Sequence, residues 1–151
     1  MRGLRRASIK DLAALVALQQ AAYARNRALM GVEPLPLKAD YREVLARYET
    51  WLVERDGTLA AALILEPRAD DLLIWSVAVA PQARRRGLGR RLLAAAEDRA
   101  ATLGKRTMRL YTGEKMTGNI AWYQRHGYAV DHIEQRPDRR VVHMVKPLAS
   151  D

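Results

Sequence analysis

The stretch from Leu72 to Gly104 constrains the fold more than any other part of this 151-residue chain. Its first part, Leu72 to Ala80, is almost wholly apolar; within it, Leu72 to Val79 is typical of a strand covered on both faces, and Pro81 closes that strand. A basic loop with two glycines follows, and Leu88 to Leu103 has the pattern of a helix that ends at Gly104. The sequence therefore predicts a central strand, a loop and a helix in immediate succession.

Shorter elements are predicted on both sides of this unit, and their order favours one domain that begins with a meander of antiparallel strands. They are a strand at Leu4 to Ala7, a helix from Ile9 to about Leu29 with a cap pair at Ser8 and Asp11, a short helix capped by Asp40 that runs through Tyr48, a hairpin of Trp51 to Glu54 with Leu59 to Leu65, a strand at Arg106 to Tyr111, a helix at Thr117 to His126, and a strand pair at Tyr128 to Ile133 and Val141 to Lys146. We expect this single domain to occupy residues 1–151.

Composition removes several classes of function. The chain has no cysteine, so it forms no disulfide, thiolate metal site or cysteine acyl-enzyme, and its three histidines lack metal-ligand spacing. The longest apolar run is shorter than the roughly 20 residues of a membrane-spanning helix, and the basic N-terminus does not lead into a signal peptide, so we expect a cytoplasmic protein. The excess of 26 Lys and Arg over 17 Asp and Glu favours polyanionic partners.

The loop before the predicted helix has the chemistry of a phosphate-binding site. Gly87 and Gly89 allow a ligand to approach the backbone, and the start of the helix presents unpaired N–H groups with a partial positive charge. Arginines surround it at positions 84, 85, 86, 90 and 91. The plainer interpretation is a bend followed by a solvated basic helix face. Neither a GxGxxG fingerprint nor the Lys-Ser/Thr ending of a P-loop is present.

Two segments resemble the signature of a known family. Val77 to Leu93, VAVAPQARRRGLGRRLL, closely resembles the acetyl-CoA signature Arg/Gln-x-x-Gly-x-Gly/Ala of the GNAT superfamily of acetyl-CoA-dependent N-acetyltransferases. Asn119 to Tyr128, NIAWYQRHGY, is similar to a second family segment that follows in the same order. Many relatives carry their asparagine seven residues before the tyrosine, where this chain has Met116. The resemblance implies an α/β GNAT-like fold, with a mixed, mostly antiparallel central sheet flanked by about four helices.

The resemblance also implies roles for individual residues in binding acetyl-CoA and in catalysis. It places cofactor contacts at Val77, Val79, Arg84, Arg85, Arg86, Gly87, Leu88, Gly89, Arg90 and Asn119. In the family, the backbone of the two valines pairs with the pantetheine arm and the loop amides hold the pyrophosphate. Tyr123 takes the position of the family's catalytic tyrosine. The alternative interpretation of Tyr123 is an aromatic residue of the core whose hydroxyl has a structural hydrogen-bond partner. No metal takes part.

The predicted reaction moves an acetyl group from acetyl-CoA to a primary amine of a small molecule or protein, by direct attack in a ternary complex. The glutamate that many relatives carry on the central strand is missing from Ile74 to Val77, and Glu33 and Glu114 are the candidate stand-ins, each with an exposed structural role as the alternative. For the acceptor pocket, we expect side chains from the variable segment 23–40, among them Tyr23, Met30, Glu33 and Leu35.

Two other functions stay open from the sequence. A nucleic-acid-binding module would use the basic residues Arg2, Arg5, Arg6, Arg84 to Arg86, Arg139 and Arg140, although the chain has no phenylalanine and no helix-turn-helix pattern. A regulatory protein that binds acyl-CoA without transferring it would explain the missing carboxylate. The acceptor, the length of the acyl group and the choice between monomer and homodimer are not determined.

Overall fold

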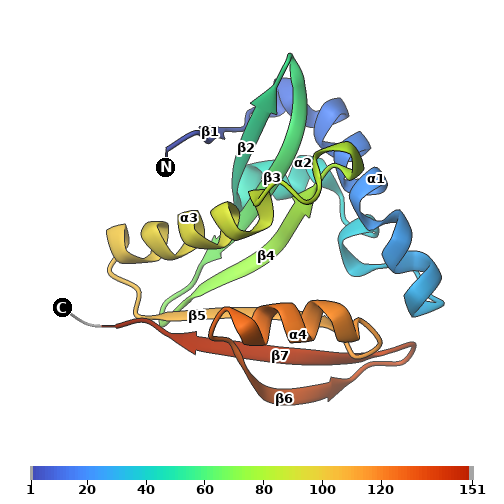
Figure 1. Ribbon diagram of the computed structural model, residues 1–151, viewed down its shortest axis with the longest axis vertical. Coiled ribbons are helices and arrows are strands. Elements are labelled where there is room, and N and C mark those ends of the chain that lie inside the picture. The colour runs from blue at the N-terminus through green and yellow to red at the C-terminus, as the bar shows by residue number, and fades with distance from the viewer. Residues whose placement is uncertain (1, 150–151) are drawn as a thin grey trace.

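The computed structural model describes residues 2–149, which form one seven-stranded sheet with helices on both faces (Figure 1). The strand order is β1-β2-β3-β4-β5-β7-β6, and every neighbouring pair is antiparallel except β4 with β5. The strands are β1 (Arg5–Arg6), β2 (Glu49–Arg55), β3 (Thr58–Pro67), β4 (Leu72–Val79), β5 (Thr107–Gly113), β6 (Ala129–Gln135) and β7 (Arg140–Pro147). The mixed, mostly antiparallel sheet with β4 at its centre is confirmed.

In the described part of the chain, four α-helices accompany the sheet, in agreement with the prediction of about four: α1 (Leu12–Met30), α2 (Tyr41–Arg47), α3 (Leu88–Thr102) and α4 (Thr117–Arg125). Short 3₁₀ turns lie at η1 (Ile9–Asp11), η2 (Leu35–Leu37) and η3 (Pro81–Ala83). The cap pair before α1 forms a capping box around η1, because the Ser8 amide donates to Asp11 Oδ2 at 2.8 Å and the Lys10 amide donates to Ser8 Oγ at 3.3 Å.

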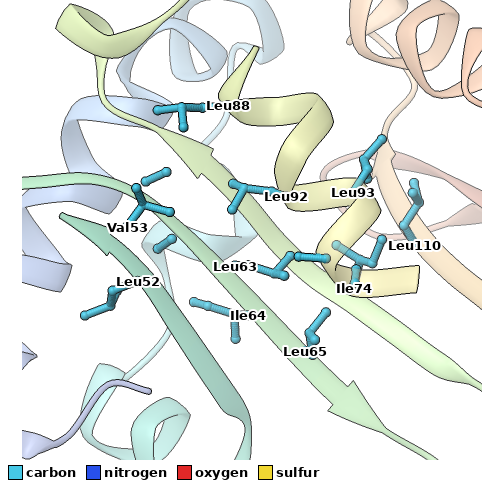
Figure 2. Close-up of a cluster of buried hydrophobic side chains, with 14 of the residues drawn as sticks. Leu52, Val53, Leu63, Ile64, Leu65, Ile74, Leu88, Leu92, Leu93 and Leu110 are labelled. Atoms are coloured by element: carbon cyan, nitrogen blue, oxygen red, sulfur yellow. The ribbon is translucent and has the colours of Figure 1, made fainter. Parts of the chain in front are cut away.

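The hydrophobic core lies on both faces of β3 and β4. Every residue from Ala60 to Leu65 is buried, which requires cover on the two faces, and α1 and α3 both pack on these strands. The inward side of α3 repeats at helical spacing through Leu88, Leu92, Ala96 and Ala100, all at most 2% exposed. Figure 2 shows the α3 leucines directed toward the β3 and β4 side chains. This packing fixes the start of α3 beside the end of β4.

Candidate active site

The site lies where the two central parallel strands separate. β4 and β5 pair only at their beginnings, where Leu72 faces Met108 and Ile74 faces Leu110. Beyond that point they diverge (Figure 1), and from Trp75 to Val79 the edge of β4 that faces β5 has no partner strand among residues 2–149. A cavity of about 590 Å³ opens in this gap between α1, β4, β5 and α4. A sheet edge exposed inside a cavity can pair with an extended ligand.

A β-bulge shapes the floor of this cavity. Ile64 pairs with Ser76 and Leu65 pairs with Ile74, so Trp75 is the extra residue on β4. A bulge increases the local twist of a strand and redirects its side chains. The centroid of the Trp75 ring lies 6.1 Å from that of Tyr41, at the start of α2, and 5.7 Å from that of Tyr48, directly after α2.

Ser76 joins a buried chain of hydrogen bonds that ends in the cavity. Gln19 Nε2 donates to Ser76 Oγ at 3.0 Å and to the Tyr41 hydroxyl at 2.8 Å, and Tyr41 in turn donates to the Pro36 carbonyl at 2.7 Å. The Pro36 carbonyl can only accept, so the Tyr41 hydroxyl donates its one proton to it. The hydroxyl can then only accept from Gln19, which requires the amide nitrogen of Gln19, rather than its oxygen, to face Tyr41. Ser76 Oγ then lies 2.8 Å from the hydroxyl of Tyr23, which lines the cavity.

The predicted cofactor loop connects β4 to α3 and leaves a run of backbone amides unpaired. Within the described chain, the amides of residues 85–90 donate to no backbone or side-chain acceptor, because the first intrahelical bond of this type runs from Arg91 to the Gly87 carbonyl at 3.1 Å. Gly87 has φ 76° and Arg85 has φ 65°, both in the left-handed region. This backbone presents several donors and the positive end of a helix at one edge of the cavity.

The ten predicted cofactor contacts fall into three groups in the structure. Those that line the cavity are Val77, Val79, Arg84, Gly89 and Asn119. Arg85, Arg86 and Gly87 are exposed on the loop at the edge of the cavity and Arg90 is exposed in the first turn of α3, whereas the Leu88 side chain is 2% exposed and belongs to the core. Arg84 also has a structural bond, because its Nη2 donates to the Ala22 carbonyl of α1 at 2.9 Å. For Leu88, only the backbone is available to a ligand.

The α4 tyrosine lines the same cavity. The centroid of the Tyr123 ring lies 5.1 Å from that of Trp122 and 5.9 Å from that of Tyr128. The Tyr123 hydroxyl has no hydrogen-bond partner among residues 2–149. Burial raises the pKa of Tyr123, so the phenol stays protonated. Trp122 lies so close to α3 that a Cβ added to Gly89 would be 3.3 Å from its ring. The glycine in the signature therefore allows α3 and α4 to approach each other.

Three of the four residues expected in the acceptor pocket line the cavity, namely Tyr23, Met30 and Leu35. Glu33 does not, since it pairs at the surface with Arg27, whose Nη2 lies 2.9 Å from Glu33 Oε1. The second stand-in base, Glu114, accepts a bond from Arg140 at 2.9 Å and is also outside the lining. Sequence reasoning missed Gln19 because a glutamine on a helix gives no sign of a contact 57 positions away.

Comparison with known proteins places the chain in a family. Residues 15–128 match the Acetyltransferase (GNAT) family, and the chain belongs to it. It is 32% identical to an amino-acid acetyltransferase from Pseudomonas paraeruginosa over 145 residues, which are 91% of this chain but only 30% of that relative. The same figures hold for the amino-acid acetyltransferase of Pseudomonas aeruginosa. The chain thus spans less than a third of the length of these relatives.

Solved structures share the fold over nearly the whole chain. The ribosomal-protein-S18-alanine N-acetyltransferase from Escherichia coli superposes with a TM-score of 0.80 at 23% identity, covering 98% of this chain and 94% of its own. The PaiA N-acetyltransferase from Thermoplasma acidophilum, in complex with coenzyme A, gives a TM-score of 0.77 at 19% identity, with 95% and 97% covered. Within residues 2–149, no helix is long and apolar enough to cross a membrane.

Proposed function

We propose that this chain transfers an acetyl group from acetyl-CoA to the amine of an acceptor bound in the same cavity. The observation that carries the proposal is the free β4 edge next to the unpaired amides of residues 85–90. A pantetheine arm has amide groups that pair with an open strand edge at Val77 and Val79, and a pyrophosphate suits a helix N-terminus surrounded by arginines. Family membership supports the same cofactor.

In the proposed step, the amine nitrogen attacks the thioester carbonyl carbon, the C–S bond breaks, and CoA leaves as a thiolate that takes up a proton. Tyr123 is the candidate donor at the sulfur. A phenol near pKa 10 is a weaker acid than a thiol near 8.5, and burial raises the pKa of Tyr123 further. We therefore assign Tyr123 a hydrogen bond to the departing sulfur, with the final proton supplied by the amine through solvent.

The acceptor must reach the thioester as a neutral amine. An alkylamine with a pKa near 10.4 is mostly protonated at neutral pH, and no carboxylate among the described residues lines the cavity to remove its proton. The rate is therefore expected to rise with pH toward the pKa of the amine. Tyr123→Phe should lower kcat by about 10-fold to 100-fold without changing the KM for acetyl-CoA.

Calorimetric titration of acetyl-CoA and CoA tests the cofactor assignment. Gly87→Glu places a carboxylate on the exposed loop among the unpaired amides, and it should abolish binding. Gly104→Glu is the matched control, because Gly104 has a similar φ of 73° and is exposed at the far end of α3. Equal binding by both variants, or no binding by the wild type, contradicts the cofactor assignment.

A regulatory role without transfer is the second candidate, and the lack of a carboxylate in the cavity favours it. The assay that separates the two is release of CoA from acetyl-CoA in the presence of amines, followed with a thiol reagent. Binding without release for every amine tested supports the regulatory role.

A further inference from the structure

The charged side chains that line the cavity all carry the same sign. They are Arg25, Arg84, Lys115, Arg125 and Arg139, and none of the described acidic residues contributes to the lining. The chain contains 17 acidic residues, so the absence does not reflect a shortage of them. A cavity of this charge repels an acceptor whose only charges are positive and attracts one that also carries an acid group.

These basic residues lie at different parts of the cavity. Arg84 lies in the loop between β4 and α3, where the phosphates of the proposed cofactor would account for its charge. Arg139 comes from the turn between β6 and β7 and precedes Val141, which pairs with Gly113 at the end of β5. The side chain of Met30, at the end of α1, packs on Gly113. Arg139 therefore lies at the end of the cavity that is formed by β5, β7 and the segment after α1, whereas Arg84 lies near the cofactor loop.

Arg139 is the buried member of this set, at 8% exposure for the residue and 3% for the side chain. Its Nε and Nη2 donate to the carboxylate of Asp138 at 3.0 and 2.9 Å. No acceptor from residues 2–149 binds Nη1. The Asp138 side chain is 47% exposed, so water screens much of its charge. A buried guanidinium with unused donors at a cavity is suited to a second oxyanion.

We infer that the acceptor is an amine that also carries a carboxylate, as in an amino acid, and that Arg139 binds that carboxylate through Nη1. The inference rests on the proposed acetyl transfer and adds the class of its acceptor. A bond from a fixed guanidinium to the carboxylate orients the acceptor, so that its amine can be directed toward the thioester. Arg139 is then a substrate-binding residue, and its loss should raise the KM for the acceptor.

The test uses two matched panels of acceptors with acetyl-CoA: the standard amino acids, and the same amino acids as neutral carboxamides. CoA release is measured, and KM is expressed per neutral amine because the amide changes the pKa of the amine. Free acids should have a KM about 10-fold or more below that of their amides. Arg139→Gln should raise the KM for the acids by about 10-fold to 100-fold while leaving the KM for acetyl-CoA and for the amides unchanged.

Arg140→Gln is the matched control, because Arg140 is exposed, pairs with Glu114 and does not line the cavity. It should leave the KM of both panels unchanged. If Arg139→Gln does not fold, Arg139→Lys keeps the charge but loses the fork geometry, and it should raise the KM for the acids selectively.

Three outcomes overturn the inference. Equal KM values for acids and amides in the wild type remove the carboxylate preference while acetyl transfer stands. A peptide with a free N-terminal alanine is assayed beside the two panels, and acetylation confined to it would identify a protein N-terminus as the acceptor. No acetylation of any panel member or of this peptide, with acetyl-CoA binding intact in calorimetry, rejects the acceptor class, keeps the cofactor site and favours the regulatory role over transfer.

Discussion

Replacing Ser76 with alanine should destabilise the fold through Gln19 rather than through Ser76 itself. Gln19 is 0% exposed, and its Nε2 has one hydrogen bond to Ser76 Oγ and one to Tyr41. Ser76→Ala leaves one buried N–H without an acceptor, which costs about 1 to 3 kcal/mol. Tyr23 also loses a partner, but it faces the cavity, where water can replace the bond. At this chain length, a loss of about 2 kcal/mol lowers Tm by roughly 4 to 8 °C.

A double-mutant cycle identifies the cause. Gln19→Met keeps the shape of the side chain and removes the orphaned donor, while Tyr41 retains its bond to the Pro36 carbonyl. The variant with both substitutions should therefore lie within about 1 kcal/mol of the wild type, with a coupling energy of about 1 kcal/mol or more. Urea unfolding followed by the fluorescence of the three tryptophans measures all four proteins. Additive losses, or a Ser76→Ala loss below about 0.5 kcal/mol, would refute this reasoning.

Three further predictions concern stability. Burial raises the pKa of Tyr23 to about 12. The stabilisation from its neutral phenol is therefore fully present below about pH 10, the ordinary pKa of tyrosine, and is lost as the pH rises through 12. Tyr23→Phe should reduce this alkaline fall in the free energy of unfolding, measured in urea. Arg99→Gln should cost about 1 to 3 kcal/mol at neutral pH, because it removes two bonds of 2.9 Å to Glu49. Hydrogen bonding to Arg99 lowers the pKa of Glu49, so this difference should shrink as the pH falls below the ordinary pKa of a glutamate and through the lowered pKa of Glu49. Gly87→Ala should cost about 1 to 2 kcal/mol in urea unfolding, since φ is 76° and the nearest atom to the new Cβ is 3.6 Å away; no loss would contradict the left-handed conformation.

Much of the fold could be predicted because its signals are local. Pro81 ends the central strand, Gly104 ends α3 with φ 73°, and Ser8 with Asp11 forms a capping box, each through the conformation or hydrogen bonds of a few neighbouring residues. The predicted boundaries differ from the structure mainly at strand ends. The strand expected at Leu4 to Ala7 is only Arg5–Arg6, because just these two residues pair with β2.

The arginines near the end of the chain show where sequence patterns stop being informative. Arg139 and Arg140 are neighbours, and the sequence grouped both in one basic surface that could contact phosphates. The structure separates them, with Arg139 buried at the cavity and Arg140 exposed in an ion pair with Glu114. Adjacent residues in an extended segment point to opposite sides, and what each side meets depends on distant elements.

The sequence by itself determined the succession of strand, loop and helix, the placement of β4 at the centre of the sheet and the resemblance to the acetyltransferase family, since periodicity, glycines and caps act over short distances. Only the tertiary structure decided that β4 and β5 separate after Ile74, that Trp75 forms a bulge, and that Gln19, Ser76 and Tyr23 share one hydrogen-bonded chain. These features depend on contacts between residues far apart in the chain. Packing and hydrogen-bond satisfaction select such contacts from many that the local pattern allows equally.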